Sequence, residues 1–151
     1  MLEDIDRRIL RLWLAEPDLS PADIGASLDV PTPTVARRIE RLRERGILRG
    51  VHGIVNWPAL GYAVEVSLRI QLDKTVANAF DLFMAAAREI PEVTEMQTFL
   101  GRVDLRLTVI ARDMTHWQSI YRSRILTLPN IAEIEALMHV ATVKTDQSLP
   151  L

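Results

Sequence analysis

Hydrophobic residues at the start of the chain recur with the period of an α-helix. Ile5, Ile9, Leu12 and Trp13 are spaced as i, i+4, i+7 and i+8, so residues 4–15 are predicted to form an amphipathic helix. The polar segment that follows contains a proline, which disfavours helical backbone in the residue before it. The first helix is therefore expected to end there, with its apolar side buried in a small core.

Two further helices are predicted before residue 47. Ser20 and Thr32 each stand directly before a proline, and a capping residue followed by proline is a typical helix start. The second helix is expected to end near Leu28 and the third at Gly46, with a tight turn at residues 29–31 between them. Three short helices, the last two joined by such a turn, are typical of a helix-turn-helix.

The third helix has an apolar side and a cationic side. At roughly 100° per residue, Val35, Ile39 and Leu42 share one side. An adjoining arc collects one hydroxyl and four guanidinium groups, from Thr34, Arg37, Arg38, Arg41 and Arg45. A helix buried on one side and cationic on the other suits a DNA groove. An ordinary solvated face is the alternative, because Glu40 and Glu44 at the edge of the arc could pair with the arginines.

A short hairpin, or wing, is expected after this helix. Ile47–Arg49 and His52–Val55 are predicted as two short strands on either side of Gly50. Arg49 and His52 could there touch the phosphate backbone of a nucleic acid, although the favoured interpretation of His52 is an exposed loop residue.

The second half of the chain alternates strand and helix patterns. Hydrophobic and polar residues alternate over residues 64–72, which predicts a half-buried strand. Helical spacing then runs from Val76 to Ala87. The later elements are strands over 93–100 and 105–109, a helix from 114 to about 128, and a strand over 134–140. This β-α-β-β-α-β order predicts an α+β protein whose second module is ferredoxin-like.

These patterns divide the chain into a winged helix-turn-helix domain (1–56), a linker containing proline and glycine (57–61) and a ferredoxin-like domain (62–151). Two helices cover only one face of a four-stranded sheet. The other face carries Arg69, Gln71, Arg106 and Thr108. Sheet-to-sheet dimerisation is therefore expected.

Charge and composition narrow the choice of function. The 151 residues have a net charge of −2, yet residues 33–53 contain six arginines and only two acidic residues, which fits phosphate contact at one surface. The absence of cysteine excludes disulfides, thiolate zinc sites and cysteine nucleophiles. No apolar run is long enough to span a membrane and the polar, acidic N-terminus is unlike a signal peptide, so we expect a cytoplasmic protein.

Motifs along nearly the whole chain resemble the Lrp/AsnC family, the leucine-responsive or feast/famine transcription regulators. The motifs are Ile5-Asp6-Arg7-Arg8-Ile9-Leu10, the stretch at 33–42, Gly46-Ile47-Leu48-Arg49-Gly50, Leu60-Gly61-Tyr62, Gly101-x-x-Asp104 and Leu128-Pro129-Asn130-Ile131. The resemblance implies a homodimer or larger even-numbered oligomer that binds double-stranded DNA and senses a small molecule, commonly an amino acid. It implies no cofactor.

The resemblance also implies roles for individual residues. In the family the recognition helix enters the major groove, which assigns DNA contact here to Thr34, Arg37, Arg38 and Arg41, of which Arg38 and Arg41 match the family's most regular basic positions. Arg45 and Arg49 extend the cationic surface. Thr32 is expected to cap the helix rather than to contact a base.

The family's effector pocket lies between neighbouring subunits, around the Gly-x-x-Asp turn. Here this implicates Leu100, Gly101, Arg102, Val103 and Asp104. Backbone amides at Gly101 could hold a carboxylate and Asp104 an ammonium group, or both residues could serve only the turn. Arg102 departs from the family pattern; it could bind an acidic effector or pair across the interface.

Two other functions fit the sequence less well. An enzyme is disfavoured because the three histidines are far apart and no phosphate-binding loop or nucleophile motif occurs. Siroheme decarboxylases share the two-domain plan but would need more basic and histidine residues in the second module. A ligand-sensing oligomer without DNA binding is disfavoured by the intact arginine arc. We therefore expect a non-enzymatic regulator.

Overall fold

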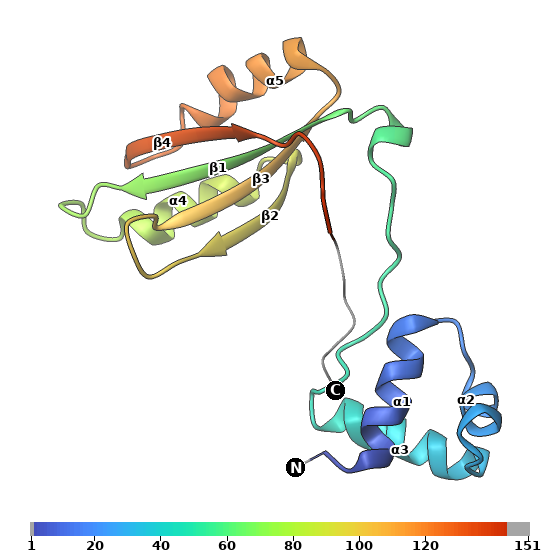
Figure 1. The fold of residues 1–151 in the computed structure, drawn as a ribbon. Helices are drawn as coiled ribbons and strands as arrows, with labels where there is room; N and C mark the ends of the chain where they lie inside the picture. Colours follow the sequence, from blue (N-terminus) through green and yellow to red (C-terminus); the bar gives the residue numbers. More distant parts are fainter. Residues whose placement is uncertain (1, 145–151) are drawn as a thin grey trace. The chain divides into compact units, whose positions relative to one another are not determined.

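The computed structural model describes residues 2–144 and divides them into separate compact units (Figure 1). The first unit includes the described residues up to Ile54, together with Val143 and Lys144, and the second spans Val55–Thr142. The segment expected to be a linker contains a short 3-10 helix, η1 (Pro58–Leu60), and groups with the second unit. Met1 and residues 145–151, the end of the expected C-terminal domain, lie outside the described residues.

Three helices form the first unit: α1 (Asp4–Ala15), α2 (Pro21–Leu28) and α3 (Thr32–Glu44). Their apolar sides meet in one small core built from the buried residues Ile9, Ile24, Val35 and Ile39. The predicted helix over residues 4–15 is confirmed at both ends, because the apolar spacing and the proline that limit it are local features. The core holds α3 by one side and leaves its other side accessible.

The ends of α3 show one wrong and one correct prediction. Thr32 is not the cap; it is already the first helical residue, and the carbonyl of Pro31 accepts the backbone N–H groups of Thr34 and Val35. Gly46 does terminate the helix, with φ of 66°. Backbone N–H groups of residues 46 and 47 donate to the carbonyls of residues 43 and 42, a Schellman arrangement that a left-handed glycine permits.

The two short wing strands expected at Ile47–Arg49 and His52–Val55 are not formed. Residues 49–56 run without regular secondary structure, and all of them are exposed. Ile54 is 90% exposed, so the apolar residues of this segment have no core to pack on. A two-stranded ribbon without a buried face gains little from pairing, which explains the difference.

The second unit is a four-stranded antiparallel sheet with two helices. Its strands are β1 (Val64–Leu72), β2 (Val93–Thr98), β3 (Leu105–Ala111) and β4 (Ile131–Met138), in the spatial order β2-β3-β1-β4. Helix α4 (Ala79–Arg88) follows β1, and α5 (Met114–Ile120) follows β3 and continues into a π-helical turn, Tyr121–Ile125. The predicted ferredoxin-like order is confirmed.

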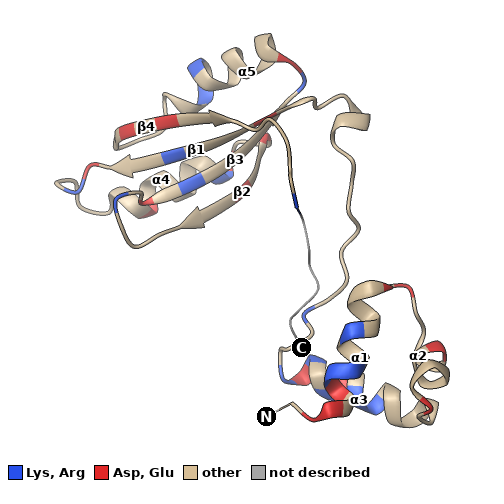
Figure 2. Cartoon of the chain, viewed as in Figure 1, with Lys and Arg blue, Asp and Glu red and all other residues tan. Residues whose placement is uncertain are grey.

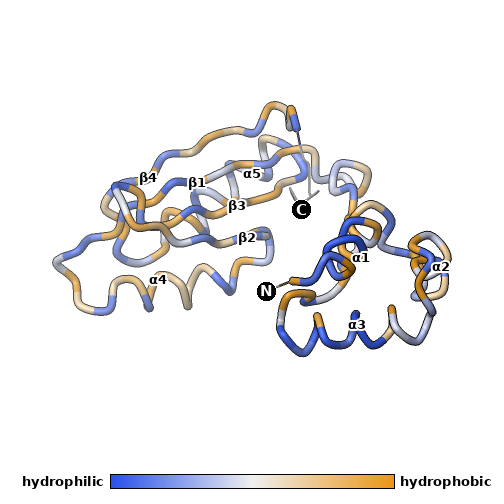
Figure 3. Tube along the Cα trace, turned by 60° about the horizontal axis from the view of Figure 1, so that its bottom comes forward, coloured by the Kyte–Doolittle hydropathy of each residue, from blue (hydrophilic) through white to orange (hydrophobic). Residues whose placement is uncertain are grey.

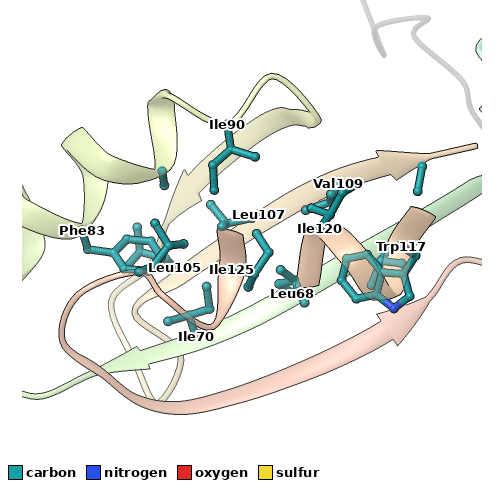
Figure 4. Close-up of a cluster of buried hydrophobic side chains, with 14 of the residues drawn as sticks. Leu68, Ile70, Phe83, Ile90, Leu105, Leu107, Val109, Trp117, Ile120 and Ile125 are labelled. Atoms are coloured by element: carbon teal, nitrogen blue, oxygen red, sulfur yellow. The ribbon is translucent and has the colours of Figure 1, made fainter. Parts of the chain in front are cut away.

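Both helices of this unit pack on the same face of the sheet (Figures 1 and 4). Phe83 of α4 and Ile120 of α5 meet Leu68 of β1 and Leu107 of β3 in one apolar core. The opposite face of the sheet, called the open face below, carries the polar residues of β1, such as the exposed Arg69. No part of the described second unit covers that face.

Candidate functional site

The cationic side of α3 is presented much as its sequence predicts. Val35, Ile39 and Leu42 are buried, and Arg37 and Arg41 on the other side are exposed. Figure 3 shows the alternation of hydrophobic and hydrophilic residues along this helix. Arg45 is also exposed and Thr34 is partly buried, so one continuous surface offers three guanidinium groups and a hydroxyl.

Arg38 is the exception, because its guanidinium group is bound within the subunit. It lies 2.8 Å from a carboxylate oxygen of Glu3 and 3.3 Å from one of Asp6, and its side chain is only 19% exposed. The other Asp6 oxygen accepts the backbone N–H of Glu3, and Asp6 is 4% exposed. The expectation that all four guanidinium groups of the arc face outward is therefore wrong at this residue.

Figure 2 shows basic and acidic residues along both α1 and α3. Glu3 brings a negative charge into the arginine surface. Its second oxygen lies 4.0 Å from Arg41, whose side chain is 64% exposed. The pKa of Glu3 is lowered, chiefly because Arg38 hydrogen-bonds its carboxylate; the same bond raises the pKa of Arg38. The cationic surface is thus partly neutralised from the N-terminal end of α1, where Glu3 is the cap residue, rather than by acids of its own helix.

The two acidic residues of α3 neutralise little of the arc. Glu40 pairs with Arg43, 3.4 Å away, and Arg43 also lies over the ring of Trp13 at 5.6 Å. Among residues 2–144, Arg37 and Arg45 have no ion-pair partner within 4.0 Å. A shallow pocket of about 460 Å³ lies along this surface. Its lining residues are Arg37, Arg38, Glu40, Arg41 and Glu44.

Two predicted DNA-contact positions lie beyond α3. Arg49 and His52 are exposed in the extended segment that follows Gly46. Because that segment forms no hairpin, its side chains are not held in a fixed array by strand pairing.

The five predicted effector residues share the loop between β2 and β3. Leu100 is fully exposed, Gly101 has φ of 156°, and a Cβ added at Gly101 would meet nothing within 4 Å. Arg102 is exposed, whereas Val103 and Asp104 are partly buried. The loop therefore offers an unobstructed backbone at its tip and an anchored end at Asp104.

Asp104 fastens this loop to the end of β1. One carboxylate oxygen accepts the backbone N–H of Leu72 at 2.9 Å, and the other lies 3.3 Å from the Nζ of Lys74. The backbone N–H of Asp104 donates to the carbonyl of Ile70. These contacts support the interpretation that Asp104 serves the turn. The oxygen that lies near the exposed Lys74 is the one that a ligand could still reach.

The open face beside the loop carries arginine and glutamate side chains. Arg69 and Arg106 lie directly opposite each other on β1 and β3, and each is paired with a glutamate of an edge strand, Glu135 and Glu95, at 3.6 Å. A shallow pocket of about 550 Å³ joins this face to the loop. Its lining residues are Arg69, Gln71, Arg102, Val103, Glu133, Ile134 and Glu135.

Other kinds of site find no support within residues 2–144. This part of the chain contains no group of three or more histidine or acidic residues placed to hold a metal ion. Nor does any helix there combine the length and apolar character that crossing a membrane requires.

Comparisons with known proteins match both units. Residues 2–49 match the family description "winged helix-turn-helix DNA-binding", and residues 65–149 match "Lrp/AsnC ligand binding domain". The chain is 34% identical over 118 residues to an HTH-type transcriptional regulator of Mycobacterium tuberculosis, covering 78% of each protein. It is 26% identical over 148 residues to the proline dehydrogenase transcriptional activator of Rhodobacter capsulatus, covering 98% of this chain and 96% of that one.

Solved structures share the fold. A transcriptional regulator from Neisseria meningitidis, crystallised as a complex with L-Met, has a TM-score of 0.90 at 20% identity and covers 99% of this chain and 97% of its own. AsnC of E. coli has a TM-score of 0.86 at 23% identity, with 97% of each chain covered. Together with the family matches over both units, these findings show that the chain belongs to the Lrp/AsnC family of transcription regulators.

Proposed function

We propose that α3 is the DNA-reading helix of this regulator and that it enters the major groove with the side opposite Val35. The observation that carries the proposal is the exposure of Arg37 and Arg41 on a helix whose other side is fixed in a core. Arginine can form two hydrogen bonds to guanine or grip a phosphate. Thr34, Arg45 and Arg49 extend the proposed contact surface.

The proposal is tested by measuring binding to the DNA upstream of the protein's own gene, by fluorescence anisotropy over a range of salt concentrations. Affinity should fall steeply as salt rises, because phosphate contacts release counterions. Arg41→Ala should weaken binding by about 5- to 150-fold, the equivalent of one good base contact. Arg88→Ala removes an exposed arginine of α4 and should leave affinity unchanged.

Salt-independent binding, or equal losses in both variants, would contradict the assignment of α3. Loss of folding is separated from loss of contact by circular dichroism of each variant.

We further propose that a small molecule, an amino acid in the first instance, binds at the loop of residues 100–104 and alters DNA affinity. The loop tip is exposed and its glycine leaves the backbone accessible. The ligand must bind one arrangement of the protein better than another, since equal affinity for both shifts nothing. The Neisseria relative that was crystallised with L-Met supports an amino acid as the first class to test.

Thermal-shift screening against the common amino acids tests this site, because a specific ligand raises the melting temperature by mass action. Asp104→Asn retains an acceptor for the Leu72 N–H but removes the charge that an ammonium group would need. It should reduce the ligand-induced shift while the unliganded melting temperature stays close to wild type. Asp81→Asn, an exposed acid of α4, is the matched control. An unchanged response in Asp104→Asn would reject that role.

The assembly proposed here is a homo-oligomer with an even number of subunits that meet through the open faces of their sheets. Each dimer would then present two copies of α3 to a near-palindromic site. The support is the polar, uncovered face and its exposed charged residues, which can pair with opposite charges on a second copy. Light scattering coupled to size-exclusion chromatography should give an even multiple of 17.1 kDa, and a monomer at micromolar concentration would contradict the assembly.

A further inference from the structure

The first turn of α1 and the middle of α3 form one charged cluster whose function goes beyond helix packing. Its members are Glu3, Asp6, Arg38 and Arg41. Asp6 is buried and Arg38 nearly so, whereas Glu3 and Arg41 are 56% and 64% exposed. The cluster therefore has an inner, structural half and an outer half that faces the proposed DNA.

The guanidinium group of Arg38 is fully engaged by contacts within the cluster. Its guanidinium spans two carboxylates, and one of them, on Asp6, is buried and has no other side-chain partner among the described residues. Pulling Arg38 out to meet a phosphate would leave that buried carboxylate without its counter-charge, which is costly. These contacts favour a role for Arg38 in fixing the orientation of α3 relative to α1 rather than in contacting DNA.

The outer half places a carboxylate where a phosphate would have to approach. Glu3 holds one oxygen on Arg38 and turns the other toward Arg41 at 4.0 Å. A phosphate that bound Arg41 would face this negative charge at a similar distance and would be repelled by it. A base edge carries no net charge, so contact of Arg41 with guanine is opposed far less.

We propose that Glu3 is a specificity-determining residue that weakens binding to arbitrary DNA phosphate, and that Arg38 is the positioning residue that holds Glu3 and α3 in place. The lowered pKa of Glu3 keeps its carboxylate charged throughout the neutral range, in agreement with this role. Non-specific binding depends almost entirely on phosphate contacts, whereas specific binding also uses base contacts. Glu3 therefore penalises the non-specific complex more than the specific one.

The test compares wild type and Glu3→Gln on two duplexes, the upstream site and a random sequence, across a salt series. Glu3→Gln should bind random DNA about 3- to 10-fold more tightly, with a smaller gain on the specific site. The slope of log affinity against log salt should steepen by about 1 on random DNA, because Arg41 gains a phosphate contact. Glu16→Gln removes an equal charge from the exposed end of α1 and should change affinity less than twofold.

A purely structural role gives the opposite result. If Glu3 only supports the helices, Glu3→Gln weakens both DNA complexes with an unchanged salt slope, and the inference is overturned. An equal gain on both duplexes overturns the specificity claim as well.

Arg38→Lys tests the positioning role separately. Lysine keeps the charge but cannot span both carboxylates, so affinity should fall while the salt slope stays the same. A slope reduced by about 1 in Arg38→Ala would show a direct phosphate contact and would overturn the assignment. The inference rests on DNA binding by α3. A wild-type protein that binds neither duplex refutes the proposed function itself, whereas a wild-type protein that binds while Glu3→Gln shows no selective gain refutes only this inference.

Discussion

Gly25 offers the sharpest test of how the helix-turn-helix is built. The residue is buried in α2, and a Cβ placed there would lie 2.6 Å from the carbonyl oxygen of Val30 in the turn before α3. The backbone N–H of Val30 in turn donates to the carbonyl of Gly25 at 2.9 Å. The turn is therefore packed directly against the backbone of α2, and Gly25→Ala tests this contact.

Two opposing effects set the size of the change. Alanine in place of glycine inside a helix normally stabilises by about 0.5–1 kcal/mol, and Gly25 has no left-handed φ that would oppose the substitution. Against this, the backbone at Val30 would have to retreat by roughly 0.8 Å to restore ordinary contact, and overpacking of this kind costs about 1–3 kcal/mol. The expected net loss lies between about 0 and 2.5 kcal/mol, with a middle value of about 1 kcal/mol.

The assay is urea unfolding of the full chain combined with DNA-binding affinity. Gly25→Ala should lower the midpoint of unfolding of the first unit and weaken DNA binding, because the turn sets the direction in which α3 leaves α2. Gly53→Ala is the control, since a Cβ there meets nothing within 4 Å and the residue is exposed. Its stability should stay within about 0.5 kcal/mol of wild type. A Gly25→Ala protein that is more stable than wild type would refute the close packing of turn and helix.

Three further predictions concern the packing, capping and charge of single residues. Phe83→Ala should cost about 3–5 kcal/mol in unfolding experiments, because the ring is fully buried; a loss no larger than that of Phe80→Ala, which is 41% exposed on the same helix, would contradict this. Asp113 accepts the backbone N–H of residue 116 at the start of α5, so Asp113→Ala should cost about 1 kcal/mol and Asp113→Asn only a few tenths, as measured by thermal unfolding; equal losses would exclude capping. The lowered pKa of Glu3 adds stability above the usual carboxyl pKa, and this is lost as pH falls through the lowered value; Glu3→Gln should flatten that part of the stability–pH curve, and an unaltered curve would contradict the ion pair.

The elements with the most regular local patterns, α1 and β1, could be predicted to the residue. Strand β1 is confirmed at Val64–Leu72, because strict alternation over nine residues has few other interpretations. Helix α4 begins later than the spacing from Val76 suggested. Asn78 adopts a left-handed conformation with φ of 60° directly before the helix, and the side chain of Asp73 accepts hydrogen bonds from Thr75 in the preceding turn. Turn chemistry here overrides hydrophobic spacing.

Local patterns could not predict the π-helical turn at Tyr121–Ile125 or the absence of the wing strands. The spacing of hydrophobic residues does not distinguish an α-helical from a π-helical turn here. Ile125 is buried in the observed π-helical turn, and an α-helical turn would also be expected to bury it. For the wing, the alternation of residues 52–55 predicted a strand, but a strand also needs a partner and a covered face. Neither can be inferred from four residues taken alone.

The candidate sites illustrate the same limit for side chains. Arg38 was predicted to contact DNA, and Asp104 to hold a ligand or to serve only the turn; each is engaged within the fold by a residue about thirty positions away, Asp6 and Leu72. Nothing local to either residue reveals those partners, because the contacts exist only once helices or strands have packed. The side chain of such a residue first forms hydrogen bonds and ion pairs within the fold, and only its remaining polar atoms can bind a ligand.

One sequence feature nevertheless separates Arg38 from its neighbours. On the helical wheel it lies only about 40° from Leu42, at the border of the apolar side, whereas Arg37 lies about 140° from Leu42. A charged side chain at such a border is partly buried when the apolar side packs, and a partly buried charge requires a partner within the protein. The arginines farther from that border keep their guanidinium groups in solvent, and they are the ones to test first for DNA contact.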